Sequence, residues 1–179
     1  MAHCNSLKWI FFLGVFCFFS ANSVAKSDSA KAGQFFEKGK YAKAATYYQK
    51  ALAANPKNAE YHFKLGATFD ALEKFDDAIL SYEAALKYDY TDKYLIYNNL
   101  GVSYGKKKVL HLAITAFEQS LQLNPKYVGA LFNLGMAYIT KGDKENALRQ
   151  FEKLKTLDFD SAQRLMENLS GDEPPASQD

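Results

Sequence analysis

The chain has 179 residues, which is enough for one domain with its own hydrophobic core. Its 22 Lys and Arg residues nearly balance its 20 Asp and Glu residues, so the charge gives no reason to expect nucleic acid or an anionic membrane as the main partner. Both cysteines, Cys4 and Cys17, lie within the first twenty residues, which leaves the rest of the chain without a thiol for a disulfide or a redox site.

Residues 1–25 are predicted to be an export signal. Lys8 supplies a positive charge, Trp9 to Phe19 is an apolar run, and Ser23-Val24-Ala25 offers small residues for cleavage. A spanning helix needs about 20 apolar residues, and this run is about half that length. We therefore expect cleavage after Ala25 and an exported protein, periplasmic in a bacterium and secreted otherwise. An uncleaved membrane anchor is the alternative.

The first two segments after the signal are predicted to be helix pairs. Residues 25–58 hold helices over Ser27–Lys38 and Tyr41–Ala54, and Gly39 between them suits the left-handed turn that ends a helix. Residues 59–92 hold helices over Glu60–Leu72 and Phe75–Tyr88, preceded by Asn58 as a plausible N-cap.

Two further pairs and a single helix complete the predicted domain, 26–170. Residues 94–127 hold helices over Tyr94–Tyr104 and Leu110–Leu123. Residues 128–161 hold helices over Val128–Thr140 and Lys144–Leu157. A capping helix is expected over 161–169, and the tail 171–179, which contains Pro174-Pro175 and little apolar content, is expected to be disordered.

Small and aromatic residues recur through these pairs at one interval. Ala44, Ala78, Ala113 and Ala147 are separated by 34, 35 and 34 positions, and each is followed four positions later by Tyr or Phe. Residues i and i+4 share one face of a helix, so each pair presents a small residue and an aromatic ring together. The dipeptides Leu65-Gly66, Leu100-Gly101 and Leu134-Gly135 repeat at the same period. A fixed period of this length indicates a repeat architecture.

The pattern resembles the tetratricopeptide repeat family over roughly residues 25–161. The resemblance implies an all-α fold, a right-handed solenoid of antiparallel helix pairs with about four repeats. It also implies a non-enzymatic adaptor or scaffold that binds an extended or helical peptide segment of a partner in a concave groove. The family's groove positions correspond here to Phe63, Lys64, Asn98, Asn99, Val102, Lys106, Phe132, Asn133 and Met136.

Two features of these positions suggest what the groove binds. Asn99 and Asn133 occupy the same repeat position, and one carboxamide offers both a donor and an acceptor to a peptide backbone. Phe63, Phe132 and Met136 offer apolar surface for ligand side chains. The alternative is that Asn is simply common at this position of the family, and that the terminal helix covers Phe132, Met136 and Ile139.

A run of lysines and a group of tyrosines can each be interpreted in two ways. The Lys106-Lys107-Lys108 run either holds an acidic partner or is a solvated turn. The tyrosines around position 92 either form a binding surface or fill an irregular junction between repeats. These tyrosines are Tyr88, Tyr90, Tyr94 and Tyr97.

No catalytic or metal-binding arrangement is expected. Gly101 to Gly105 matches the G-x-S-x-G nucleophile motif around Ser103, but the motif requires a strand-to-helix turn and here lies within a predicted helix. His62 and His111 have no ligand-spaced neighbours. We therefore expect no enzymatic activity and no cofactor. The partner is expected to be another protein, with membrane contact only through envelope partners; a homo-oligomer whose groove is filled by a neighbouring copy is the alternative.

Overall fold

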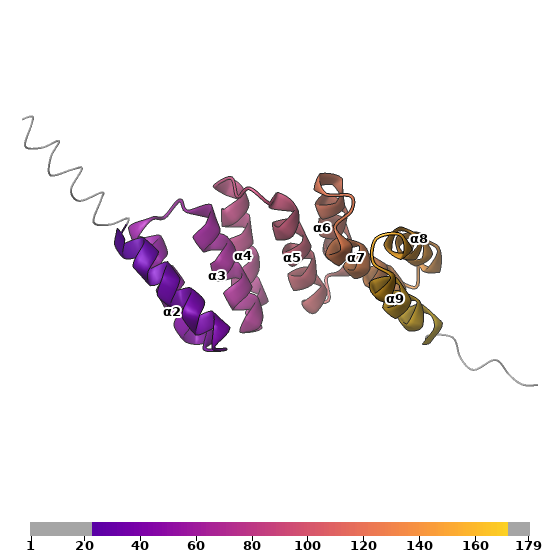
Figure 1. The fold of residues 1–179 in the computed structure, drawn as a ribbon, viewed down its shortest axis with the longest axis horizontal. Helices are drawn as coiled ribbons and strands as arrows, with labels where there is room; N and C mark the ends of the chain where they lie inside the picture. Colours follow the sequence, from indigo (N-terminus) through magenta and orange to yellow (C-terminus); the bar gives the residue numbers. More distant parts are fainter. Residues whose placement is uncertain (1–22, 172–179) are drawn as a thin grey trace, which may run out of the picture. The chain divides into compact units, whose positions relative to one another are not determined.

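The computed structural model describes residues 23–171, and all regular structure in this range is helical. A helix over residues 23–37 is followed by eight more (Figure 1). These are α2 (Tyr41–Ala54), α3 (Ala59–Ala71), α4 (Phe75–Lys87), α5 (Lys93–Lys106), α6 (Leu110–Leu123), α7 (Val128–Lys141), α8 (Lys144–Lys155) and α9 (Phe159–Gly171). The predicted all-α class is confirmed.

Most of the predicted export signal and of the predicted tail lies outside the described residues, in 1–22 and 172–179. The helix over 23–37 begins before the expected cleavage point, and Ala25 is buried in a cluster with Ala51 and Tyr61. The cleavage position stays a prediction. Across residues 23–171, none of the helices combines the length and the apolar composition needed to cross a membrane.

The chain divides into two compact units, Met1–Tyr90 and Thr91–Asp179. In the first unit, α3 packs against α2 and α4. In the second unit each helix from α5 to α8 packs against the next one in sequence, and α7 also packs against α5 and α9. Helices α5, α7 and α9 therefore form one layer of the second unit, and α6 and α8 form the other. This is the arrangement of stacked helix pairs.

The turns inside the helix pairs share a left-handed residue. Gly39, Glu73, Lys108 and Gly142 have φ of 67°, 56°, 62° and 77°. Glycine adopts this conformation without steric cost, whereas a residue with a Cβ is less stable there. The first and last turns therefore have the residue best suited to this conformation, as expected for Gly39, while the two middle turns place a charged side chain at the same position.

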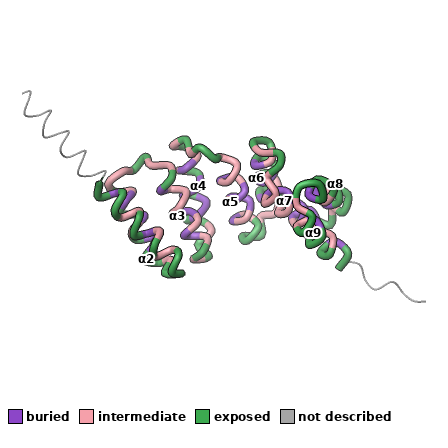
Figure 2. Tube along the Cα trace, in the orientation of Figure 1, coloured by how far each residue is buried: buried purple, intermediate pink, exposed green. Residues whose placement is uncertain are grey.

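The repeated small residues lie where the helices pack most closely. Ala44, Ala78, Ala113 and Ala147 are fully buried. A Cβ added to Gly101 would lie 2.5 Å from the ring of Phe117, so a larger residue would force a shift at the contact between α5 and α6. Buried and exposed positions alternate along each helix (Figure 2), as expected for helices that pack on one side.

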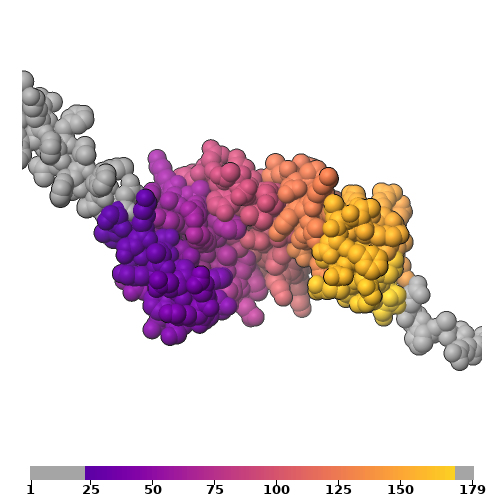
Figure 3. Space-filling view, in the orientation of Figure 1, coloured from indigo at the N-terminus to yellow at the C-terminus, as the bar shows by residue number. Residues whose placement is uncertain are grey.

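Helix α9 closes the second unit, where its atoms form the yellow surface in Figure 3. Ala162 and Leu165 of α9 form a buried cluster with Leu131 of α7 and Leu154 of α8. A Cβ on Gly135 would lie 2.5 Å from Leu165, so the third repeat glycine packs against α9. The helix begins at Phe159 and ends at Gly171, longer at both ends than expected.

Candidate peptide-binding site

A chain of three side-chain amides joins α5 to α7. Asn133 Nδ2 donates a 3.0 Å hydrogen bond to Asn98 Oδ1, and Asn98 Nδ2 donates a 3.3 Å hydrogen bond to Asn99 Oδ1. Asn98 is only 6% exposed, so both of its polar groups are satisfied inside the protein. It therefore orients its two neighbours, and its burial keeps its own amide away from a ligand.

Asn99 and Asn133 are half-buried at the two ends of this chain. Within the described residues, the side-chain atoms Asn99 Nδ2 and Asn133 Oδ1 have no hydrogen-bond partner. One end of the chain thus offers a donor and the other an acceptor. An extended peptide backbone needs this combination.

The other predicted site residues of the second unit differ in how far they are buried. Val102 packs against the core cluster that contains Ala113 and Phe117. Phe132 and Met136 pack against the cluster that includes Leu165 of α9, and the Arg164 guanidinium carbon lies 5.1 Å from the Phe132 ring centroid. Both side chains are half-buried, so α9 covers part of their apolar surface. Lys106 is exposed near the end of α5.

The first unit has a pocket of about 270 Å³ that contains its two predicted site residues. Phe63, Lys64 and Ala67 line it from α3. The rest of the lining comes from the first repeat, namely Gly33, Phe36, Glu37 and Tyr48. The pocket combines aromatic walls with one cationic and one anionic side chain.

The pocket side chains are held in place by neighbours in the same unit. The Phe63 ring stacks on Tyr90 at a centroid distance of 4.6 Å. Lys64 Nζ lies 2.7 Å from Glu60 Oε1, and the hydrogen bond to that carboxylate raises the pKa of Lys64. Burial raises the pKa of the Tyr48 hydroxyl. Lys64 therefore carries its charge at the pocket with a carboxylate already beside it.

Sequence reasoning missed the first-repeat side of this pocket, although a signal for it existed. Gly33 and Phe36 lie 34 positions before Ala67 and Asp70, so applying the repeat period to the second repeat's groove positions would have found both. The first repeat matches the pattern less well, since it has Lys31-Ala32 where the later repeats have Leu-Gly. Tyr48, which follows Ala44 at the repeated aromatic position, is 3% exposed and also lines the pocket.

The structure shows structural roles for the residues with an apparent catalytic pattern. Ser103 is fully buried in the last turn of α5, and its Oγ donates a 3.1 Å hydrogen bond to the Asn99 backbone carbonyl oxygen. The exposed strand-to-helix turn of a nucleophile motif is absent at this position. His62 stacks on Tyr88 at 5.3 Å, with Nε2 2.9 Å from the Pro56 carbonyl oxygen. In the part of the chain that the structure describes, no group of three or more His, Cys, Asp or Glu residues is arranged to hold a metal ion.

The junction tyrosines pack inside their own units. Tyr88 and Tyr90 stack on His62 and Phe63 of the first unit. Tyr94 makes an edge-to-face contact with Tyr127 in the second unit, at a centroid distance of 5.1 Å. These contacts favour the packing interpretation of the three tyrosines.

Three models of one repeat family match this chain. A model described as TPR repeat matches residues 34–72, and two described as tetratricopeptide repeat match 59–92 with 94–127, and 116–149. Helix pairs stacked in this way form an all-α solenoid. The chain carries tetratricopeptide repeats over most of its described residues, and its fold is that of a tetratricopeptide-repeat solenoid.

Curated relatives share part of the chain. The chloroplastic tetratricopeptide repeat domain-containing protein PYG7 of Arabidopsis thaliana is 36% identical over 114 residues, which cover 62% of this chain and 38% of that protein. The peroxisomal targeting signal receptor of Candida albicans is 35% identical over 85 residues, which cover 48% of this chain and 14% of the receptor. The chain thus spans well under half the length of either relative.

Solved structures share the fold. A crystal structure of MamA protein is 25% identical with a TM-score of 0.70, and the match covers 82% of this chain and 83% of that one. The first tetratricopeptide repeat domain of Spaghetti, bound to an HSP90 peptide, is 22% identical with a TM-score of 0.64. That match covers 68% of this chain and 95% of the Spaghetti chain.

Proposed function

We propose that this protein is a non-enzymatic adaptor that binds an extended peptide segment of another protein. The observation that carries the proposal is the hydrogen-bonded chain Asn133–Asn98–Asn99 on α5 and α7. Its buried middle residue fixes the two outer amides, so the donor and acceptor for a peptide backbone are already oriented before binding. Such preorganisation lowers the entropic cost of association.

Apolar surface next to the amides supplies anchors for ligand side chains. The parts of Phe132 and Met136 that α9 leaves uncovered, together with Val102, lie in the same unit as the amides. Lys106 adds a positive charge near the end of α5. In the first unit, the aromatic pocket beside Phe63 and Lys64 suits an apolar ligand side chain with a polar end.

The named relatives support a peptide as the ligand class. One is a receptor for a peroxisomal targeting signal, and one similar structure holds an HSP90 peptide.

We also propose that the protein acts outside the cytoplasm as an envelope scaffold. The apolar run Trp9–Phe19 and the small residues at Ser23-Val24-Ala25 support this location.

We call the surface formed by Asn98, Asn99 and Asn133 the amide face. Its role can be tested with peptides selected from a random library on the wild-type protein. The Asn99→Ala/Asn133→Ala double variant should bind the selected peptides at least about tenfold more weakly, because each lost amide removes roughly 1 kcal/mol of hydrogen bonding. Gln119→Ala/Gln122→Ala is the matched control, since both are exposed amides on α6. Equal affinities of the double variant and wild type would refute the amide face as the binding site.

Light scattering on the same samples tests the alternative that a neighbouring copy of the chain fills the groove. A strictly monomeric wild type at all concentrations supports a foreign peptide as the occupant. An oligomer that dissociates in the Asn99→Ala/Asn133→Ala variant would assign the groove to a neighbouring copy instead.

A further inference from the structure

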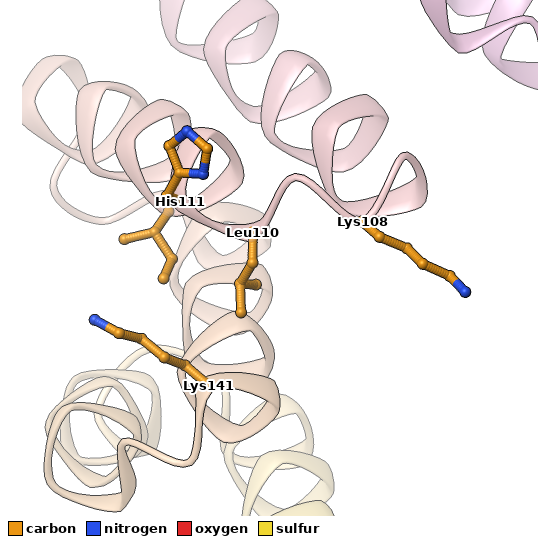
Figure 4. A pocket seen from close by; sticks show the side chains of 5 residues that line it. Lys108, Leu110, His111 and Lys141 are labelled. Atoms are coloured by element: carbon orange, nitrogen blue, oxygen red, sulfur yellow. The ribbon is translucent and has the colours of Figure 1, made fainter.

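A second pocket of about 470 Å³ lies in the second unit, and Asn98, Asn99 and Asn133 are not among the residues that line it. It is lined by Lys108 in the α5–α6 turn, by Leu110, His111 and Ile114 of α6, and by Lys141 at the end of α7. Figure 4 shows Leu110 between the two lysines, whose side chains extend to opposite sides of it. The volume falls in the range of ligand-binding sites, roughly 300–1,000 Å³.

The polar lining of this pocket is made only of nitrogen-bearing side chains. Lys108 and Lys141 are exposed cations, and His111 adds ring nitrogens. Asp143 lies close enough to Lys141 to interact electrostatically with it. Both Asp143 oxygens already accept hydrogen bonds from Asn146, at 3.2 Å from the backbone nitrogen and 2.8 Å from Nδ2. Within the described residues, neither lysine has a carboxylate within ion-pair distance, so the pocket has an excess of positive charge.

The start of α6 adds to this excess. Val109 precedes the helix and provides no side-chain cap, and the first turn contains no acidic residue. By contrast α4 has Asp76 and Asp77 in its first turn, and α8 has Asp143 as its N-cap. The free N–H groups at a helix N-terminus favour a negative charge nearby. Neither the residue before α6 nor the first turn of α6 supplies one.

Lys108 stands at a position where the backbone favours glycine. Its φ is 62°, and the corresponding turns of the first and fourth repeats use Gly39 and Gly142. A lysine there makes the turn less stable than a glycine would, yet it places a cation at the edge of the pocket. Lys108 thus adds a positive charge at the pocket and lowers the stability of the turn.

The floor of the pocket is aliphatic. Leu110 and Ile114 are half-buried and pack against the core cluster that contains Ala113 and Phe117.

We propose that this pocket binds an acidic peptide segment of a partner protein, in which an aliphatic side chain lies on Leu110 and Ile114 and flanking carboxylates pair with Lys108 and Lys141. A single small anion would leave the aliphatic floor uncovered, which is why a peptide fits the pocket better. The site is additional to the amide face and does not depend on it.

Fluorescence anisotropy with a labelled peptide, Glu-Leu-Asp-Glu-Ile-Asp, tests the proposal on the full chain. The amide analogue, Gln-Leu-Asn-Gln-Ile-Asn, should bind at least about tenfold more weakly, and raising salt from about 50 to about 500 mM should weaken only the acidic peptide. Lys108→Gln/Lys141→Gln should reduce its affinity about tenfold, as expected for two exposed ion pairs. Lys126→Gln/Lys153→Gln is the control for the change in net charge, since both lysines are exposed in the same unit.

Lys108→Gly separates binding from folding. This variant relaxes the left-handed turn, so its melting temperature should rise while its affinity for the acidic peptide falls about threefold. Asn99→Ala/Asn133→Ala should leave acidic-peptide binding unchanged, since the amide face is a different site. Equal affinity of wild type and Lys108→Gln/Lys141→Gln, or an equal loss in Lys126→Gln/Lys153→Gln, would overturn the proposal.

Discussion

Asn133 Nδ2 lies 3.0 Å from Asn98 Oδ1, so the fourth repeat donates a side-chain hydrogen bond to the third. The two residues are 35 positions apart and do not occupy the same repeat position, because Asn133 corresponds to Asn99. Asn98 and Asn99 therefore play different parts. Asn98 is hydrogen-bonded to both of the others, and Asn99 and Asn133 are the two that we propose bind the ligand.

Asn98→Leu tests this division. The replacement keeps the branched shape of the side chain and substitutes methyl groups for its polar atoms, so we expect the free energy of unfolding to change by no more than about 1 kcal/mol. Peptide affinity should nevertheless fall about fivefold, because Asn99 and Asn133 lose the partner that fixes their orientation. Chemical denaturation and anisotropy with library-selected peptides measure the two quantities. Gln122→Leu on α6 is the control, and an unchanged affinity in Asn98→Leu would argue against an orienting role.

Two glycines of α5 should respond in opposite ways to alanine. A Cβ at position 101 would lie 2.5 Å from the Phe117 ring, whereas one at position 105 has only Ala113 Cβ at 4.0 Å. Gly101→Ala should lower the free energy of unfolding by about 1–2 kcal/mol through overpacking. Gly105→Ala should raise it by about 0.5 kcal/mol through helix propensity. Urea denaturation of both variants checks this, and a stabilised Gly101→Ala would mean that α5 and α6 can separate without cost.

The capping role of α9 depends on Leu165, which is 1% exposed. Leu165→Ala should cost about 2–4 kcal/mol, as expected when a fully buried leucine is truncated. Leu157→Ala serves as the control, since Leu157 is 40% exposed and should cost less than about 1 kcal/mol. Thermal melts followed by circular dichroism measure both. Similar losses in the two variants would show that α9 is not packed as described.

Stability at alkaline pH should depend on Tyr138. Burial and a 2.9 Å hydrogen bond donated to Glu118 Oε1 raise the pKa of Tyr138 from 10.0 to about 12. The folded state therefore holds this proton more tightly than the unfolded state. The contribution to stability is complete below pH 10 and is lost as the pH rises from about 10 to about 12.

Tyr138→Phe should accordingly lose less stability than wild type over that range, measured by urea denaturation at successive pH values. Other alkaline titrations are common to both proteins and cancel in the difference. Tyr41→Phe, at a half-buried tyrosine of the first unit, is the control. Parallel pH curves for wild type and Tyr138→Phe would contradict the assignment.

Much of the fold was predictable because it depends on local signals repeated along the chain. Tyr41–Ala54 and Leu110–Leu123 were predicted to the residue, and Gly39 adopts the left-handed conformation expected of it. Asn58 also caps α3 as expected, accepting a 2.9 Å hydrogen bond from the Tyr61 backbone nitrogen. Helix ends shifted where such signals were weak: α5 continues through Gly105 to Lys106, and α9 extends past both predicted ends.

The candidate site was less predictable, because it depends on which side chains meet between helices. The repeat period singled out Asn98, Asn99 and Asn133 together as groove residues. Only the packing of α5 on α7 distinguishes the buried amide that orients from the two that remain available. The Lys106-Lys107-Lys108 run was one candidate for holding an acidic partner. That Lys108 lines a pocket together with Leu110, Ile114 and Lys141 was not predicted, since these residues come from a turn, a helix start and a helix end that no motif connects.

The sequence by itself determined the helices, their pairing and the repeat to which they belong, since these follow from spacings of four and of about 34 residues within one chain. Only the tertiary structure decided which polar groups are already satisfied by neighbours and which are left for a ligand. The physical reason is that hydrogen bonding and charge compensation depend on distances of a few ångströms between side chains of different helices, and a linear pattern does not contain those distances.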